Sequence, residues 1–197
     1  MTRKLIMVAT LAVLASGGGA LAQQSTNIRG TITGFDGRIL SVDARGGGVV
    51  AVEVPESINV AITKPFSLAD VKPGMVLGVT TVNRADGKVV AIDVRPIPAT
   101  ANQGLSPHDL APQSTMTNAA VEATAAATEG NELTLNYKSG TVTVLVLPGT
   151  AMSQAAPGSR SDLKVGETVF VAARRTDAGG LTAARVQVSK DGVKPTQ

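Results

Sequence analysis

The chain has 197 residues, of which 43% are hydrophobic, 17% are charged and 2% are aromatic. This composition excludes a disordered chain, and the length allows at most two ordinary domains. The absence of Cys excludes a disulfide framework and a thiolate metal site. The single His, His108, excludes a multi-His metal site, and a Ser-His-Asp triad would depend on that one residue.

The first 22 residues are typical of a secretory signal peptide. Arg3 and Lys4 give a short basic start, residues 5–15 are apolar or small, and Ala20-Leu-Ala22 is a cleavage motif. The apolar run is too short for a membrane span, which disfavours a retained anchor. We therefore expect a periplasmic or secreted protein, with no membrane span after cleavage. Cleavage lowers the count of basic residues from 18 to 16, against 15 acidic ones. The nearly neutral mature chain therefore has no long-range electrostatic attraction to nucleic acid.

The rest of the chain contains two copies of one unit. An offset of 93 residues aligns Gly37–Asp43 with Gly130–Asn136, and it also pairs Val49 with Val142 and Pro55 with Pro148. After a one-residue deletion, an offset of 92 aligns Asp70, Lys72, Gly74, Val79, Gly87, Ala91 and Val94 with Asp162, Lys164, Gly166, Val171, Gly179, Ala183 and Val186. The predicted organisation is a signal peptide (1–22), module one (26–95), a linker (96–116), module two (117–188) and a tail (189–197).

Hydrophobic residues within a module alternate with a period of two, which predicts strands. The strands of module one are expected at 28–35, 38–44, 49–54, 76–82 and 89–95, with hairpin turns at Asp36-Gly37 and Asp86-Gly87. Between the third and fourth strands we expect a longer non-strand passage with one helical turn, from Ser67 to Gly74 and from Ser161 to Gly166. Residues 119–127 are rich in Ala and favour a helix by propensity, but the repeat alignment predicts a strand there.

The predicted fold class is all-β: two tandem five-stranded small β-barrels of OB-like type, with another five- or six-stranded topology left open. The motifs G-x-(I/L)-x-V, V-x-V-x-V-P, D-(L/V)-K-x-G and D-G-x-(L/V)-x-A, with the linker string Asp109–Asn118, resemble a family of exported bacterial proteins of unknown function. The resemblance covers both modules and implies tandem small β-barrels rather than an activity. Relatives are sometimes labelled metal-transporter permeases, which does not suit a chain without a span after its signal.

Few residues are candidates for chemistry. His108 and Asp109 lie in the Pro- and Gly-rich linker and could contribute to a metal site, although a lone His is more often a solvated loop residue, and the resemblance implies an aromatic side chain there. Met75, Met116 and Met152 could form a copper-type thioether site, but core packing is the favoured interpretation. Sequence reasoning identifies no catalytic residue and no cofactor.

OB-type barrels bind ligands through their 1–2 and 4–5 loops. Basic residues in the corresponding loops are the candidate ligand-binding residues, namely Arg38, Arg84, Lys88, Arg174 and Arg175. Because aromatic platforms are scarce, an envelope protein or glycan is a better partner than nucleic acid. The expected function is a non-enzymatic, exported binding or interaction module. The alternatives are a periplasmic metal-handling accessory protein and a hydrolase with paired carboxylates.

An interface is also predicted. The alignment of Val49 with Val142 places Thr143, Leu145 and Leu147 inside module two, as it places Val50, Val52 and Val54 inside module one. It leaves Val142, Val144 and Val146 facing outward without a charged neighbour. An apolar outer row needs cover, so these three residues are expected to contact the linker, the other module or a partner.

Overall fold

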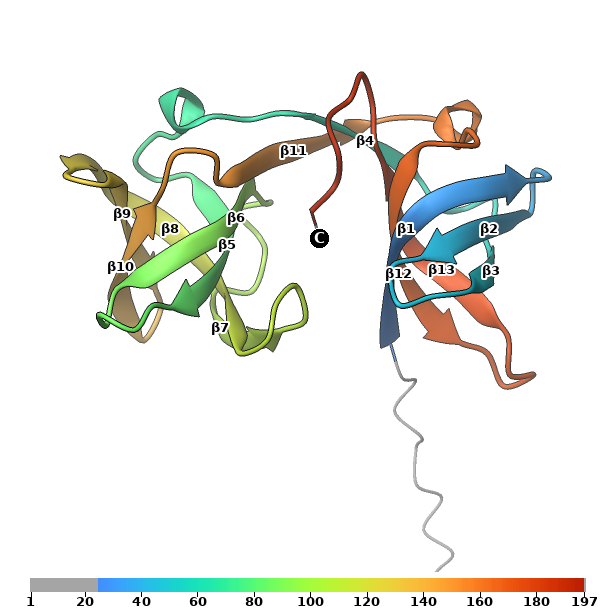
Figure 1. Cartoon of the computed structure of the whole chain (residues 1–197), viewed down its shortest axis with the longest axis horizontal. Helices are drawn as coiled ribbons and strands as arrows, with labels where there is room; N and C mark the ends of the chain where they lie inside the picture. Colours follow the sequence, from blue (N-terminus) through green and yellow to red (C-terminus); the bar gives the residue numbers. More distant parts are fainter. Residues whose placement is uncertain (1–24, 197) are drawn as a thin grey trace, which may run out of the picture.

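The computed structural model describes residues 25–196, which form strands and two short 3-10 turns (Figure 1). The predicted signal peptide lies outside the described residues. The first repeat supplies β1 (Ser25–Phe35), β2 (Ile39–Ala44), β3 (Val49–Glu53), β4 (Val60–Pro65), the 3-10 turn η1 (Leu68–Asp70), β5 (Val76–Asn83) and β6 (Val89–Pro96). After β7 (Gly104–His108), the second repeat supplies β8 (Ser114–Ala127), β9 (Gly130–Tyr137), β10 (Gly140–Val146), β11 (Ala151–Pro157), the 3-10 turn η2 (Arg160–Asp162), β12 (Thr168–Arg175) and β13 (Leu181–Val188).

The all-β fold class is confirmed. Two groups of five strands each form a closed cycle of pairings, and we name them lobe A (β1, β2, β3, β13, β12) and lobe B (β5, β6, β10, β9, β8). Each lobe surrounds its own apolar core, with Leu40 and Val186 fully buried in lobe A and Leu77 and Leu133 in lobe B. Within residues 25–196 no helix has the length and apolar character needed to cross a membrane.

The lobes do not follow the predicted modules. Lobe A combines β1–β3 of the first repeat with β12 and β13 of the second, and lobe B combines β5 and β6 of the first with β8–β10 of the second. The prediction that 26–95 and 117–188 each close on themselves is therefore wrong. The hairpins β5–β6 and β12–β13 are equivalent in the two repeats, and so are the strands against which they pack. The sequence therefore identifies the matching strands but does not show to which lobe each hairpin belongs. The predicted linker also contains a strand, β7, which pairs with β8.

Two strands absent from the prediction connect the lobes. β4 pairs with β13 of lobe A, β11 pairs with β6 of lobe B, and the two strands pair with each other in antiparallel fashion across the centre of the molecule (Figure 1). Thr63 pairs with Ala155, and these residues occupy equivalent positions 92 residues apart in the two repeats. The pairing is thus symmetric about this point, and the connection between lobes is itself a piece of sheet.

The observed pairings also change the alignment of the repeats at the first strand. The β1–β2 pairing has a bulge between Ile32 and Gly34, and the β8–β9 pairing has one between Val121 and Ala123. These positions differ by 89 residues, so β8 extends three residues further than β1 before its turn. Residues 119–127 are in a strand, as predicted, although their counterparts are not the ones that the 93-residue offset assigned.

A second change in alignment reverses the predicted interface. Leu40 pairs with Val52 in lobe A, whereas its counterpart Leu133 pairs with Val144 in lobe B, so the one-residue deletion falls in the turn before β10. A slip of one residue moves every side chain of a strand to the opposite face. Val144 and Val146 are therefore core residues of lobe B, with exposed fractions of 0% and 2%, and Val142 packs against the same core. The prediction of Val142, Val144 and Val146 as an outer interface is wrong.

The short helical turns stand near their predicted places. Each begins at a Ser whose backbone N–H donates to the Asp three residues later, Ser67 to Asp70 and Ser159 to Asp162, both at 2.9 Å. The predicted start at Ser161 was two residues late. Of the hairpin glycines, Gly37, Gly87 and Gly179 adopt a positive φ, which favours glycine. Gly130 does not; a Cβ at this position would lie 2.3 Å from the carbonyl oxygen of Val146.

Candidate functional site

The first half of β1 has one open edge. Residues 25–31 pair with β12, but β2 pairs only with residues 30–35, and no other described strand lies beside Ser25–Arg29 on the side of β2. In lobe B the corresponding stretch of β8, residues 114–118, pairs with β7 along its whole length, and residues 115–118 also pair with β5 on the other side. Among residues 25–196, lobe A therefore has no strand in the position that β7 occupies in lobe B.

The backbone of β1 presents hydrogen-bonding groups at this edge. The carbonyl of Arg29 accepts a hydrogen bond from the Arg45 N–H (2.8 Å) on the side of β2. Because alternate residues of an antiparallel strand direct their backbone groups to the same side, the N–H and C=O groups of Asn27 and Ser25 face the open edge as well. Ile28, between them, faces β12 instead and pairs with Val171.

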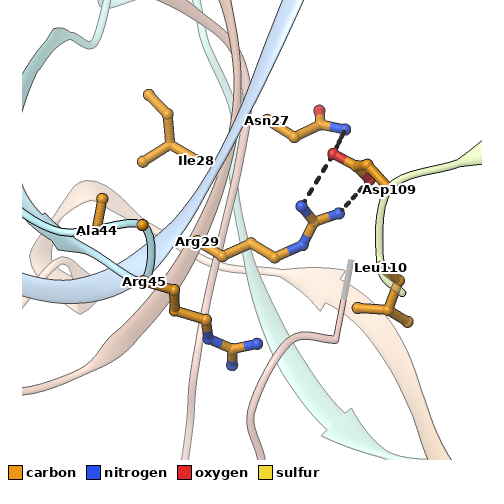
Figure 2. Close-up of a pocket in the computed structure, with 8 residues that line it drawn as sticks. Asn27, Ile28, Arg29, Ala44, Arg45, Asp109 and Leu110 are labelled. Carbon is orange, nitrogen blue, oxygen red and sulfur yellow. Dashed lines mark hydrogen bonds and ion pairs between the residues drawn. The ribbon is translucent and has the colours of Figure 1, made fainter. Parts of the chain in front are cut away.

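A cleft of about 430 Å³ lies at this edge. It is lined by β1, by the turn between β2 and β3 and by the loop after β7, through Asn27, Ile28, Arg29, Ala44, Arg45, Gly46, Asp109 and Leu110. Figure 2 shows Arg29 and Arg45 extending from lobe A toward the loop that carries Asp109 and Leu110. The cleft thus lies where the two lobes approach each other.

One ion pair closes the outer side of the cleft. Arg29 donates to both carboxylate oxygens of Asp109, at 2.8 and 3.1 Å, and Asn27 Nδ2 donates to one of them at 3.0 Å (Figure 2). The hydrogen bonds from Arg29 are the main reason that the pKa of Asp109 falls to about 2. The Arg29 guanidinium also lies 5.3 Å from the centre of the Phe170 ring, which restricts its position.

Arg45 has a different environment. Its side chain is exposed, and within residues 25–196 its guanidinium forms no ion pair. The charged residues of the cleft are therefore two arginines and one aspartate, and Asp109 is already engaged by Arg29. This arrangement leaves a positive charge at the end of the open edge, available for an acidic group.

A second polar group lies deeper between the lobes, on β6. The Asp93 side chain is fully buried, pairs with Arg95 and accepts a hydrogen bond from Thr196 of the C-terminal tail. Burial lowers the pKa of Arg95, which also contacts the sulfur of Met116 at 3.6 Å. These contacts give Asp93 two partners within the molecule, so the cluster connects the tail to lobe B.

The predicted metal candidates lie side by side but are engaged elsewhere. His108 Nε2 is 3.8 Å from Asp109 Oδ1, and His108 Nδ1 accepts from the Leu110 N–H at 3.3 Å. Both Asp109 oxygens accept hydrogen bonds from lobe A, and burial lowers the pKa of His108. The described residues contain no group of three or more His, Asp or Glu side chains that could hold a metal ion.

The predicted basic residues do not form one surface. They lie at the hairpin ends of two different lobes, and three of them are neutralised locally: Arg38 by Glu53 (3.0 Å), Arg84 by Asp86 (2.6 Å) and Glu129 (2.8 Å), and Lys88 by Glu129 (3.2 Å). Arg174 and Arg175 are exposed at the end of β12, where Arg175 donates to the Gly179 carbonyl at 3.3 Å.

Asn27, Arg29 and Arg45 were not among the predicted site residues. Arg29 alternates with the buried Ile28 and Gly30, so the sequence places it on the outer face of a strand but gives no sign of its partner, 80 residues away. The open edge itself follows from the position of β7, a segment that the sequence pattern assigns to the linker.

Comparisons with known proteins identify no relative of this chain. No family model matches the chain, and neither a curated protein nor a solved structure gives a significant match. The resemblance to exported proteins of tandem small barrels is therefore carried by the sequence motifs alone.

Proposed function

We propose that this chain is an exported, non-enzymatic binding protein of the cell envelope, and that it engages its partner through the cleft beside β1. The proposal takes each lobe as a small OB-like barrel, with a short helical turn in the connection before its closing hairpin. It takes the cell envelope as the location because of the predicted signal peptide and the family resemblance.

The observation that carries the proposal is the combination of an open strand edge and an unneutralised arginine in one cleft. Unpaired backbone groups at a strand edge are a template for association with another molecule, and proteins usually cover or disrupt such edges. Lobe B covers the equivalent position with β7, and lobe A does not. A partner that covers this edge would satisfy the backbone of Asn27 and the charge of Arg45 together.

Site-specific photo-crosslinking in living cells tests the proposal. A photoreactive amino acid replaces Gly46, an exposed residue that lines the cleft, and a matched control places it at Val165, which is 70% exposed and lies outside the cleft. We expect a discrete covalent adduct from position 46 and none from position 165. Equal yields, or no adduct at position 46, would show that the cleft is not where the protein binds.

A further inference from the structure

We infer that the partner is an extended peptide segment of another protein, which adds to lobe A as a strand antiparallel to β1. This inference rests on the proposed function and specifies the chemical class of the partner. It uses the main chain of Ser25–Arg29 for affinity and Arg45 for selection of an acidic side chain.

The molecule contains its own example of this interaction. β7 pairs with β8 in antiparallel register from Gly104↔Asn118 to His108↔Ser114, and β8 is the repeat counterpart of β1. Shifting these partners by the 89 residues that separate the two bulges places them on Ser25–Arg29. A strand in the same relation to β1 would occupy the cleft that is empty in lobe A.

The described chain does not supply this strand. The same shift of 89 residues places the counterpart of β7 at residues 15–19, within the predicted signal peptide. β7 itself is already paired with β8. The occupant is therefore assigned to another molecule.

The position of the charges sets the direction and the preferred end of the peptide. β7 runs with Gly104 opposite Asn118, the counterpart of Arg29, so the N-terminal end of a docked peptide would lie beside Arg29 and Arg45. Arg29 is held by Asp109, which leaves Arg45 as the exposed cation at that end. An acidic residue at the N-terminal end of the peptide complements it.

The test uses the purified protein and three labelled peptides. The probe has the sequence Glu-Glu-Thr-Val-Thr-Val-Thr-Val, and the other two peptides carry N-methyl groups on one or the other set of alternate residues. A docked strand donates hydrogen bonds to β1 only from the alternate residues whose N–H groups face β1. We expect one methylated peptide to lose at least about tenfold in affinity while the other stays within about twofold of the probe. If both bind as well as the probe, or both fail, strand addition is refuted.

A second readout locates the docked strand. Hydrogen exchange measured by NMR should slow at the amide of Asn27 when the probe binds, whereas Ile28, whose backbone faces β12, should not change. Arg45→Glu should weaken the probe at least about tenfold and favour a peptide that begins with two Lys. Lys164→Glu makes the same charge change on an exposed residue outside the cleft and should have no effect.

The outcomes separate the two proposals. A crosslink at position 46 without alternation between the methylated peptides would leave a binding protein whose partner is not a strand. The absence of a crosslink would overturn the proposed function itself, whatever the peptides do.

Discussion

Cutting the chain between β6 and β7 is a direct test of how the strands are shared. The exposed residues Ala99 and Thr100 lie in this connection, where a protease recognition sequence can be inserted. Cleavage divides the protein into one fragment that ends after β6 and one that begins before β7. Each lobe needs strands from both fragments. We therefore expect the cut protein to elute as a single species at the size of the intact chain.

The free energy that holds the two fragments together can be estimated from the buried side chains. The shared hairpins carry seven fully buried branched side chains, Val169, Val171, Val186 and Val188 in lobe A and Leu77, Val79 and Val94 in lobe B. At about 1.5–3 kcal/mol each, their burial stabilises the complex of fragments by roughly 10–20 kcal/mol. The strands that they cover add further burial, so this is a lower bound, to be compared with about 4–15 kcal/mol for association.

The assay is size-exclusion chromatography combined with far-UV circular dichroism, before and after cleavage. The uncut protein with the same insertion is the control. If the fragments separate and each keeps its β-sheet spectrum, then each repeat folds on itself and the strand sharing described above is wrong. If they separate and unfold, the burial estimate is too high.

Two further predictions concern lobe B and the cleft. Val144→Ala should destabilise the protein by about 2–3 kcal/mol in urea unfolding because Val144 is fully buried. Thr143→Ala, on the exposed face of the same strand, should change stability by less than about 0.5 kcal/mol. Equal effects of the two substitutions would contradict the register of β10. The pKa of Asp109 is lowered from 3.8 to about 2, so its pairing stabilises the protein above pH 4, and this contribution disappears as the pH falls toward 2. The difference in melting temperature between the protein and Asp109→Asn should therefore shrink between pH 5 and pH 2, and a constant difference would show that the charge of Asp109 is not involved.

Sequence periodicity located most strands because most of them have one solvent-exposed face and one apolar face. The inward rows of β1 and β2, with Ile28, Ile32, Leu40 and Val42, follow the alternation directly. The three missed strands differ in this respect: β7 lies largely at the surface, β4 contains a buried Thr63 that donates to the Val188 carbonyl at 2.9 Å, and β11 has no branched apolar residue. Val60 and Ile62 of β4 are the only alternating branched apolar pair in these three strands, which is too short a row for periodicity to predict a strand.

The errors in the repeat alignment have a common physical origin. Gly, Asn and Ser residues in the hairpin turns match each other wherever the gap is placed, so the sequence does not locate an insertion within a turn. The fold does locate it, because only one register buries Val144 with Leu133. The candidate site was harder to predict, since Arg29 and Asp109 meet only after both lobes have formed.

Under the export proposed above, the strand order has a consequence for how this chain would fold as it emerges from a membrane channel. Lobe B consists of one uninterrupted stretch from β5 to β10, whereas lobe A joins residues 25–53 to residues 168–188. Lobe B can close while the last strands are still inside the channel, but β1–β3 remain with an incomplete core until β12 and β13 arrive. Such waiting exposes apolar strands to misassociation and slows folding, because contacts distant in sequence form last. The N-terminal strands are thus the segment most in need of a chaperone during export.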